Sequence, residues 1–220
     1  MSLRFDLSTM GPGEIYDLLA NLIVPRPIAF VSTVSRLGDA NIAPFSYFML
    51  GGIAPPSLCF APVRGRQGEK KETLLNVEET EEFVVSLVER DMAEGMNRAA
   101  GEYPGVVDKW AISGFTAAES ERVKPARVAE APASFECRVH QIVHHGDGPG
   151  ASAYVIGEIL LAHIREDLRD TVSGAGGFLP IARLGGKDYF DLAASGTFQM
   201  ARPAPEMPSQ TYEAVDNSRD

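Results

Sequence analysis

The sequence predicts a mainly β or α+β fold built from antiparallel strands, and its apolar runs support this class. Four runs rich in β-branched and apolar residues are typical of strands: 28–34, 40–50, 57–63 and 82–88. Two longer candidate strands, 133–144 and 153–165, flank a Gly-Asp-Gly-Pro-Gly sequence at 146–150, which is typical of a hairpin. Long hairpins with helices between them favour a β-barrel or α+β arrangement over a doubly wound parallel sheet.

Three segments beside these strands have the apolar spacing of helices. The pattern in 13–23 predicts a helix that the following Pro-Arg-Pro sequence must end, because proline removes an amide hydrogen from the backbone. Similar patterns predict helices at about 70–80 and 91–100, and Asp91 is expected to cap the second of these. The stretch 101–114 is expected to be irregular.

Length and composition fit one globular domain with a short tail. Of the 220 residues, 45% are hydrophobic and 23% are charged, which are ordinary globular values. We expect one domain over residues 1–200 and a polar, proline-rich tail over 201–220. The chain shows neither a signal peptide nor an apolar run long enough to span a membrane, so we expect a cytoplasmic protein with no membrane partner. Cys59 and Cys137 are expected to be reduced core residues.

The net charge of −10 argues against a nucleic acid partner, because neutralising phosphates needs a basic surface. One segment differs from the rest of this acidic chain: residues 64–71 hold four cations and one anion. Lys70, Lys71 and Thr73 follow where a helix is expected to begin, and free N–H groups at a helix start favour an anion. Two interpretations remain open here, an anion site and a solvated loop.

The run Asn41-Ile42-Ala43-Pro44-Phe45-Ser46-Tyr47-Phe48 combines aromatic side chains, hydroxyl groups and a proline in one strand-like stretch. Pro44 cannot donate to a sheet ladder, so the strand should lie at an edge or carry a bulge. A kinked strand would expose amides to a flat polar ring. The alternative, which the run by itself favours, is an aromatic core with a break in the strand.

Common catalytic and metal-binding signatures are absent from the sequence. It contains no Gly-x-Ser-x-Gly elbow, no phosphate loop of the Gly-x-x-x-x-Gly-Lys type and no His-Glu-x-x-His pair. His140, His144 and His145 are better explained as solvated residues at a hairpin end than as metal ligands. We therefore assign no catalytic residue and no metal site.

Three segments in order resemble the flavin reductase-like family, the FMN-binding split-barrel proteins that include the flavoredoxins. They read PRPIAFVST at 25–33, NIAPFSYF at 41–48 and KETLLN at 71–76. The resemblance implies a six-stranded antiparallel split β-barrel with peripheral helices, a homodimer, and one FMN per subunit near the dimer interface.

The resemblance also implies cofactor-binding residues. The following would lie along the isoalloxazine: Asn41, Pro44, Phe45, Ser46, Tyr47 and Phe48. Lys71 and Thr73 match the family's phosphate-binding Lys-Asp-Thr, in which Glu72 replaces the aspartate, and Arg26 and Arg64 would help. The asparagine that often follows the Ser-Tyr-Phe run is Met49 here, so no ligand contact is assigned to that position.

The function that the resemblance implies is an FMN-dependent oxidoreductase of the NAD(P)H:flavin reductase type. NAD(P)H would be the electron donor, and a partner oxygenase or another acceptor would receive the electrons. The flavin would perform the redox step while the protein positions it. Two alternatives are a flavoredoxin-like carrier with bound FMN and no NAD(P)H activity, and a split-barrel binding module that has lost its flavin.

Overall fold

The computed structural model describes residues 2–101, 103, 107–173 and 177–195, so the predicted tail at 201–220 lies outside the described residues. The helices and strands are, in chain order: η1 Leu7–Thr9, α1 Pro12–Leu22, β1 Arg26–Pro27, β2 Ala29–Val34, β3 Ala40–Phe45, β4 Phe48–Ile53, β5 Pro56–Phe60, α2 Glu72–Thr80, β6 Glu82–Ser86, η2 Arg90–Met92, α3 Ala93–Ala99, α4 Lys109–Ser113, β7 Ala117–Ala118, β8 Arg127–Val128, β9 Ala133–His145, β10 Ser152–Ile164, η3 Glu166–Ser173, β11 Ile181–Arg183, β12 Tyr189–Asp191 and α5 Leu192–Ser195. The η elements are 3₁₀ helices.

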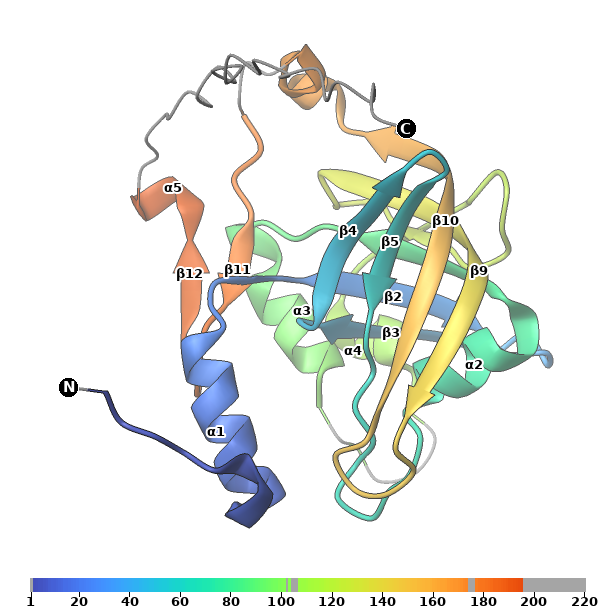
Figure 1. Ribbon diagram of the computed structural model, residues 1–220. Coiled ribbons are helices and arrows are strands. Elements are labelled where there is room, and N and C mark those ends of the chain that lie inside the picture. The colour runs from blue at the N-terminus through green and yellow to red at the C-terminus, as the bar shows by residue number, and fades with distance from the viewer. Residues whose placement is uncertain (1, 102, 104–106, 174–176, 196–220) are drawn as a thin grey trace, which may run out of the picture.

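A seven-stranded antiparallel sheet in the order β3-β2-β6-β9-β10-β5-β4 forms the barrel. Its two edge strands, β3 and β4, are consecutive in the chain, and only Ser46 and Tyr47 separate them. Three Cα steps span at most about 11 Å, so the two edges must approach each other at this corner. The sheet therefore curls on itself, and Figure 1 shows β2 and β3 crossing behind β4, β5, β9 and β10. The predicted mainly β, antiparallel fold class is confirmed, and the sheet has seven strands where the resemblance implied six.

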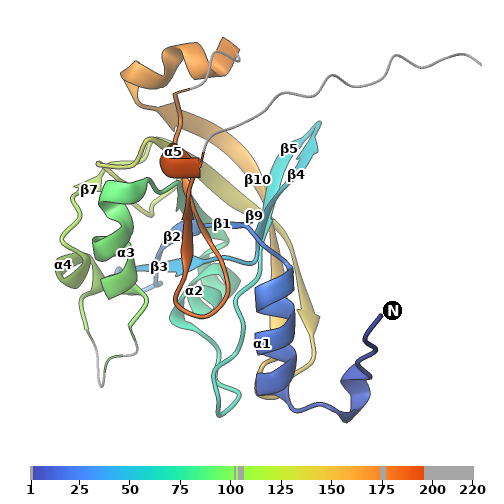
Figure 2. The same ribbon diagram turned by 90° about the vertical axis from the view of Figure 1, so that its left-hand side faces the viewer.

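Two apolar cores pack against the two faces of β2. Its alternate side chains Ala29 and Val31 face the barrel interior, whereas Phe30 belongs to the outer core. The barrel interior also contains Phe60, Phe83, Val85, Cys137, Val155 and, from α2, Leu74 and Val77. The outer core contains Ile42, Met92, Met96, Trp110 and Val128. Figure 2 shows α3 and α4 covering the side of β2 and β3 that faces away from β4 and β5.

The predicted strand at 40–50 is wrong as a single element, because the chain turns at Ser46-Tyr47 and continues as β4. The expectation for Pro44 is confirmed: it lies in β3, at one edge of the sheet, opposite Phe30. Edge strands tolerate proline because one row of their N–H positions has no partner strand.

The segment after β6 differs from its prediction. Asp91 caps no helix, because it lies inside η2 and α3 begins two residues later. The stretch 101–114 is not wholly irregular, since it contains α4, whose N-terminus is capped by the Asp108 carboxylate. The small sheets β1-β11-β12 and β7-β8 were not predicted from the sequence, because strands of two or three residues show no periodicity.

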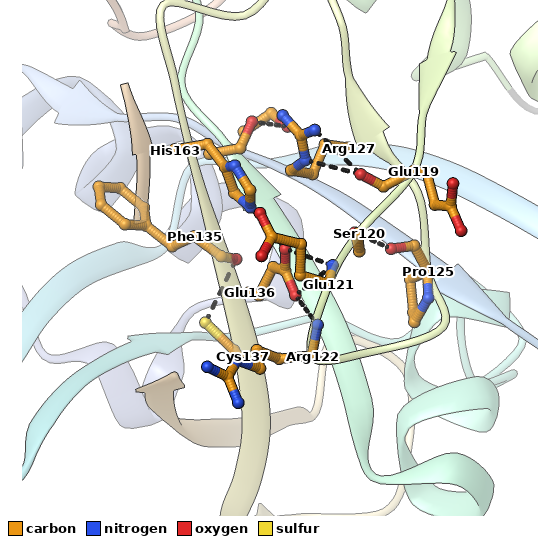
Figure 3. Close-up of polar contacts among 12 residues, drawn as sticks. Glu119, Ser120, Glu121, Arg122, Pro125, Arg127, Phe135, Glu136, Cys137 and His163 are labelled. Carbon is orange, nitrogen blue, oxygen red and sulfur yellow. Dashed lines mark hydrogen bonds and ion pairs between the residues drawn. The ribbon is translucent and has the colours of Figure 1, made fainter. Parts of the chain in front are cut away.

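A buried carboxylate holds the loop before β8 against the barrel (Figure 3). Glu136 on β9 is fully buried, and its oxygens accept hydrogen bonds from the backbone N–H groups of Glu121 and Arg122 at 2.6–3.1 Å. The Nε2 of His163 on β10 lies 2.5 Å from Glu136 Oε1. Burial raises the pKa of Glu136, but the hydrogen bonds from Glu121, His163 and Arg122 outweigh it and leave the pKa below its ordinary value of 4.5.

Replacing Glu136 by glutamine should lower the free energy of unfolding by about 2–3 kcal/mol, because an amide offers one acceptor oxygen to three donors. Since the pKa of Glu136 is lower in the folded state, the contribution of its carboxylate is complete above about pH 5 and is lost as pH falls through the folded pKa. Urea unfolding should therefore show that the free energy of unfolding falls less between about pH 7 and about pH 4 in the variant than in the wild type. The control is Glu121→Gln, because Glu121 is exposed and only its backbone contacts Glu136. Equal losses in Glu136→Gln and in this control would contradict the prediction.

Candidate functional site

The cationic segment ends at the start of α2, as the sequence predicted. Lys71 is the N-cap residue of α2, and Thr73 lies in the first helical turn with 1% of its surface exposed. The first N–H groups of a helix have no acceptor within the helix, and together with the helix dipole they favour an anion at this position. Lys70 comes just before and forms an ion pair with Glu78 at 2.6 Å.

A buried chain of polar side chains fixes Thr73 against the barrel. The Nδ2 of Asn41 on β3 donates to Thr73 Oγ1 at 2.8 Å and lies 3.4 Å from Thr33 Oγ1, which accepts from Asn76 Nδ2 at 3.0 Å. Because the Thr73 oxygen accepts from Asn41, its own hydrogen is available to another acceptor. Asn41 Oδ1 is buried and has no hydrogen-bond partner among the described residues, a condition that is frequent at functional sites.

A pocket of about 510 Å³ brings the two predicted motifs together. Pro44 and Phe45 of β3 line one part of it, and Lys71 and Thr73 line another. The remaining lining residues are Ala43, Glu69, Lys70, Glu72, Ala99, Ala100, Gly101, Tyr103, Val107 and Lys109. The volume lies within the range of small-molecule sites. Cations, a hydroxyl group and a helix start beside an apolar wall fit a phosphate ester that carries a flat ring.

Sequence reasoning missed the pocket residues that follow α3 in the chain, among them Tyr103 and Lys109. Lys109 is the first residue of α4, and its Nζ lies 3.7 Å from Glu72 Oε2. Tyr103 donates its hydroxyl hydrogen to Arg98 O at 2.7 Å, and its ring lies so close to Gly101 that a Cβ there would come within 2.7 Å of it. The local signal for α4 was Asp108, an acidic residue of the type that caps helices, directly before Lys109.

Three other predicted residues lie at or beyond the β3–β4 corner. Ser46 is half-buried, and Tyr47 is 38% exposed. Burial, with a smaller contribution from Tyr16, raises the pKa of Tyr47, so its phenol keeps its hydrogen. Phe48 lines a second cavity of about 500 Å³, whose lining residues are all apolar. The neighbouring Met49 is 60% exposed.

The two arginines expected to help with phosphate binding do not line the pocket. Arg26 is 6% exposed, and its guanidinium donates to Ala20 O, Ile23 O and Leu184 O at 2.6–2.8 Å, with Ser46 Oγ at 3.5 Å. The Nη1 of Arg64 donates to Gly68 O and to Asp147 O, which ties the loop before α2 to the β9–β10 hairpin.

Among the described residues, the cysteines form no disulfide and the hairpin histidines form no metal cluster. Cys59 and Cys137 are free thiols, but only Cys137 is a core residue, because Cys59 is half-buried. Burial raises the pKa of Cys137. His140, His144 and His145 are exposed at the end of the hairpin. Within the described part of the chain, no group of three His, Cys, Asp or Glu side chains is arranged to hold a metal ion. None of the described helices is long and apolar enough to cross a membrane.

Comparison with known proteins agrees with this arrangement. Residues 21–180 match the family described as the flavin reductase like domain. The crystal structure of nitrilotriacetate monooxygenase component B from Bacillus cereus is 30% identical, with a TM-score of 0.82 over 91% of this chain and 99% of that chain. The 2-nitrobenzoate 2-nitroreductase NbaA of Pseudomonas fluorescens is 28% identical, with a TM-score of 0.80 over 94% and 100% of the two chains.

The fold is also that of a split-barrel-domain protein from Shewanella frigidimarina NCIMB 400, with a TM-score of 0.73 at 16% identity over 92% of this chain and 100% of that chain. The family match covers most of the chain and includes both motifs that line the pocket. The chain therefore belongs to the flavin reductase-like family of split-barrel flavoproteins.

Proposed function

We propose that this protein is an FMN-dependent oxidoreductase of the NAD(P)H:flavin reductase type. The observation that carries the proposal is the pocket in which the cationic start of α2 meets the edge strand β3. These two motifs are about 30 residues apart in the sequence, and the resemblance assigns them to the two ends of one cofactor.

The residues present fit the phosphate end of FMN. The Lys71 ammonium would contribute a charge-assisted hydrogen bond. The Thr73 hydroxyl would donate a second, because its oxygen already accepts a hydrogen bond from Asn41 Nδ2. At the other end, Pro44 and Phe45 supply an apolar wall, and Ser46 and Tyr47 supply hydroxyl groups at the corner. A binding role for Phe48, Arg26 and Arg64 rests on the resemblance alone.

The protein's part in the reaction is to bind and orient. When bound, FMN supplies the redox chemistry by accepting a hydride from a reduced nicotinamide and passing electrons onward. The side chains hold the phosphate, cover one part of the pocket with apolar groups and present neutral hydroxyl groups to a polar ring edge. No protein nucleophile or general acid is required by this proposal.

A visible absorption spectrum followed by anaerobic titration tests the proposed function. Protein mixed with FMN and then desalted is expected to stay yellow and to bleach when NADH or NADPH is added. A yellow protein that neither nucleotide bleaches would favour the flavoredoxin-like carrier. A colourless protein would favour the binding module that has lost its flavin.

The reduced flavin needs an acceptor, and the relatives suggest two kinds. A relative that is component B of a monooxygenase supports a partner oxygenase component, and a relative that is a nitroreductase supports a nitroaromatic compound. The bleached protein should regain its colour with the correct acceptor. 2-Nitrobenzoate is therefore the first compound to add, without oxygen, because oxygen reoxidises any reduced flavin.

We also propose that the protein is a homodimer. Strand β4 exposes Met49, Leu50 and Ile53, with 60%, 65% and 75% of their surfaces accessible. An edge strand with adjacent exposed apolar side chains favours burial against a partner. Light scattering should give twice the mass of one 23.7 kDa chain.

A further inference from the structure

The second cavity, which Phe48 lines, has no part in the proposed function. Its volume is about 500 Å³, and it shares no lining residue with the pocket at the start of α2. This volume also lies within the range of small-molecule sites. The floor of the cavity is buried, since Leu58 and Val88 are 2% and 1% exposed, whereas Leu50 at its mouth is 65% exposed. The cavity is therefore deep, unlike a flat apolar face.

Two parts of the fold line the cavity. The small β1-β11-β12 sheet contributes Pro27, Ala182 and Phe190, which are neighbours across its three strands and so share one face. The barrel contributes side chains of β4, β5, β9 and β10, among them Phe48 and Phe135. Both parts supply aromatic rings, and such rings form favourable edge or offset contacts with a further aromatic ring.

The cavity offers no partner to a charged group. All of the described side chains that line it are apolar. The charged residues next to them in the chain are engaged elsewhere: Arg26 donates to three backbone carbonyls, and Glu89 forms an ion pair with Arg165 at 3.0 Å. Burying a charge without a partner is costly, so this lining selects against a charged ligand.

We propose that this cavity is a second binding site, which takes an uncharged aromatic molecule. Apolar cavities hold water poorly, and an apolar ligand supplies the packing contacts that their lining lacks. The site would adjoin the proposed flavin ring. Three Cα steps join Phe45 in the first pocket to Phe48 in the second, so the two residues are at most about 11 Å apart.

A pair of fluorescent probes tests the proposal on the full chain. N-phenyl-1-naphthylamine is uncharged, and 8-anilinonaphthalene-1-sulfonate has the same rings with an added sulfonate. The uncharged probe should bind saturably, with one molecule per chain. The sulfonate should bind at least about tenfold more weakly, because the cavity pairs no charge. Saturating FMN should leave the affinity for the uncharged probe unchanged, since the two cavities share no lining residue.

Variants of Ala182 test the location of the probe. Ala182→Phe should fill part of the cavity and weaken binding of the uncharged probe at least about tenfold. Ala182→Val, a smaller change that suits a strand, should weaken it about threefold and keeps the test open if the phenylalanine variant does not fold. Ala111→Phe is the matched control, because Ala111 is exposed on α4 and does not line the cavity. It should bind the probe as the wild type does.

Several results would overturn the inference. Equal affinities for the two probes, or wild-type affinity in folded Ala182 variants, would mean that the probes bind exposed apolar surface. Displacement of the uncharged probe by FMN would place it in the flavin pocket. No binding of the uncharged probe would mean that a second copy or another part of this chain fills the cavity. A protein that binds this probe as expected but binds no flavin would support the inference and overturn the proposed function.

Discussion

A Lys71→Glu variant is expected to bind FMN at least about 100-fold more weakly than the wild type, with riboflavin affinity nearly unchanged. The substitution removes a charge-assisted hydrogen bond and places a carboxylate at the start of α2, beside Glu72. Both changes oppose a phosphate dianion, and neither affects a flavin without phosphate. Equilibrium titration of the two flavins measures the effect.

Lys71→Gln and Lys124→Glu are the controls for this prediction. The glutamine variant removes the charge without reversing it and should show an intermediate loss of about tenfold. The Lys124→Glu variant makes the same change in net charge away from the pocket and should bind FMN nearly as the wild type does. Similar losses for FMN and riboflavin in Lys71→Glu would show that the phosphate does not lie at this helix start.

An Arg26→Ala variant is expected to lose about 3–4 kcal/mol of unfolding free energy, which corresponds to a melting temperature lower by roughly 10 °C. Arg26 is 6% exposed and donates to three backbone carbonyls, two at the end of α1 and Leu184 O after β11. Alanine would leave these acceptors buried without partners. Calorimetry or thermal circular dichroism measures the change.

Arg26→Lys separates this structural role from cofactor binding. A lysine keeps the charge, but its single ammonium cannot reach the end of α1 and Leu184 O together, so less than half of the lost stability should return. If Arg26→Ala kept its melting temperature and instead lost FMN affinity selectively over riboflavin, the arginine would be a phosphate ligand, as the resemblance implied.

The strands of the barrel were predicted well from the sequence where the apolar patterns are long. The two strands of the β9–β10 hairpin are 13 residues each, and the glycine-rich turn between them is an unmistakable signal. Pro44 predicted an edge strand because its missing hydrogen is a constraint on any sheet. The start of α2 could also be predicted, since the cationic segment ends where the apolar pattern of a helix begins.

Other parts of the site depend on contacts that no local pattern contains. The role of Arg26 requires Leu184, which is 158 residues away in the sequence. Lys109 reaches the pocket only because α4 packs beside α3 on the outer face of β2 and β3, after a stretch that showed no periodicity. The break at Ser46-Tyr47 follows from the closure of the barrel. In the local sequence, only Pro44 indicates that the strand changes there.

A crystal structure of the protein with FMN tests the central claim most directly. We expect the phosphate oxygens within hydrogen-bond distance of Lys71 Nζ and Thr73 Oγ1, and the ring against Pro44 and Phe45. Density for the phosphate at another surface, with the start of α2 contacting only solvent, would contradict the account.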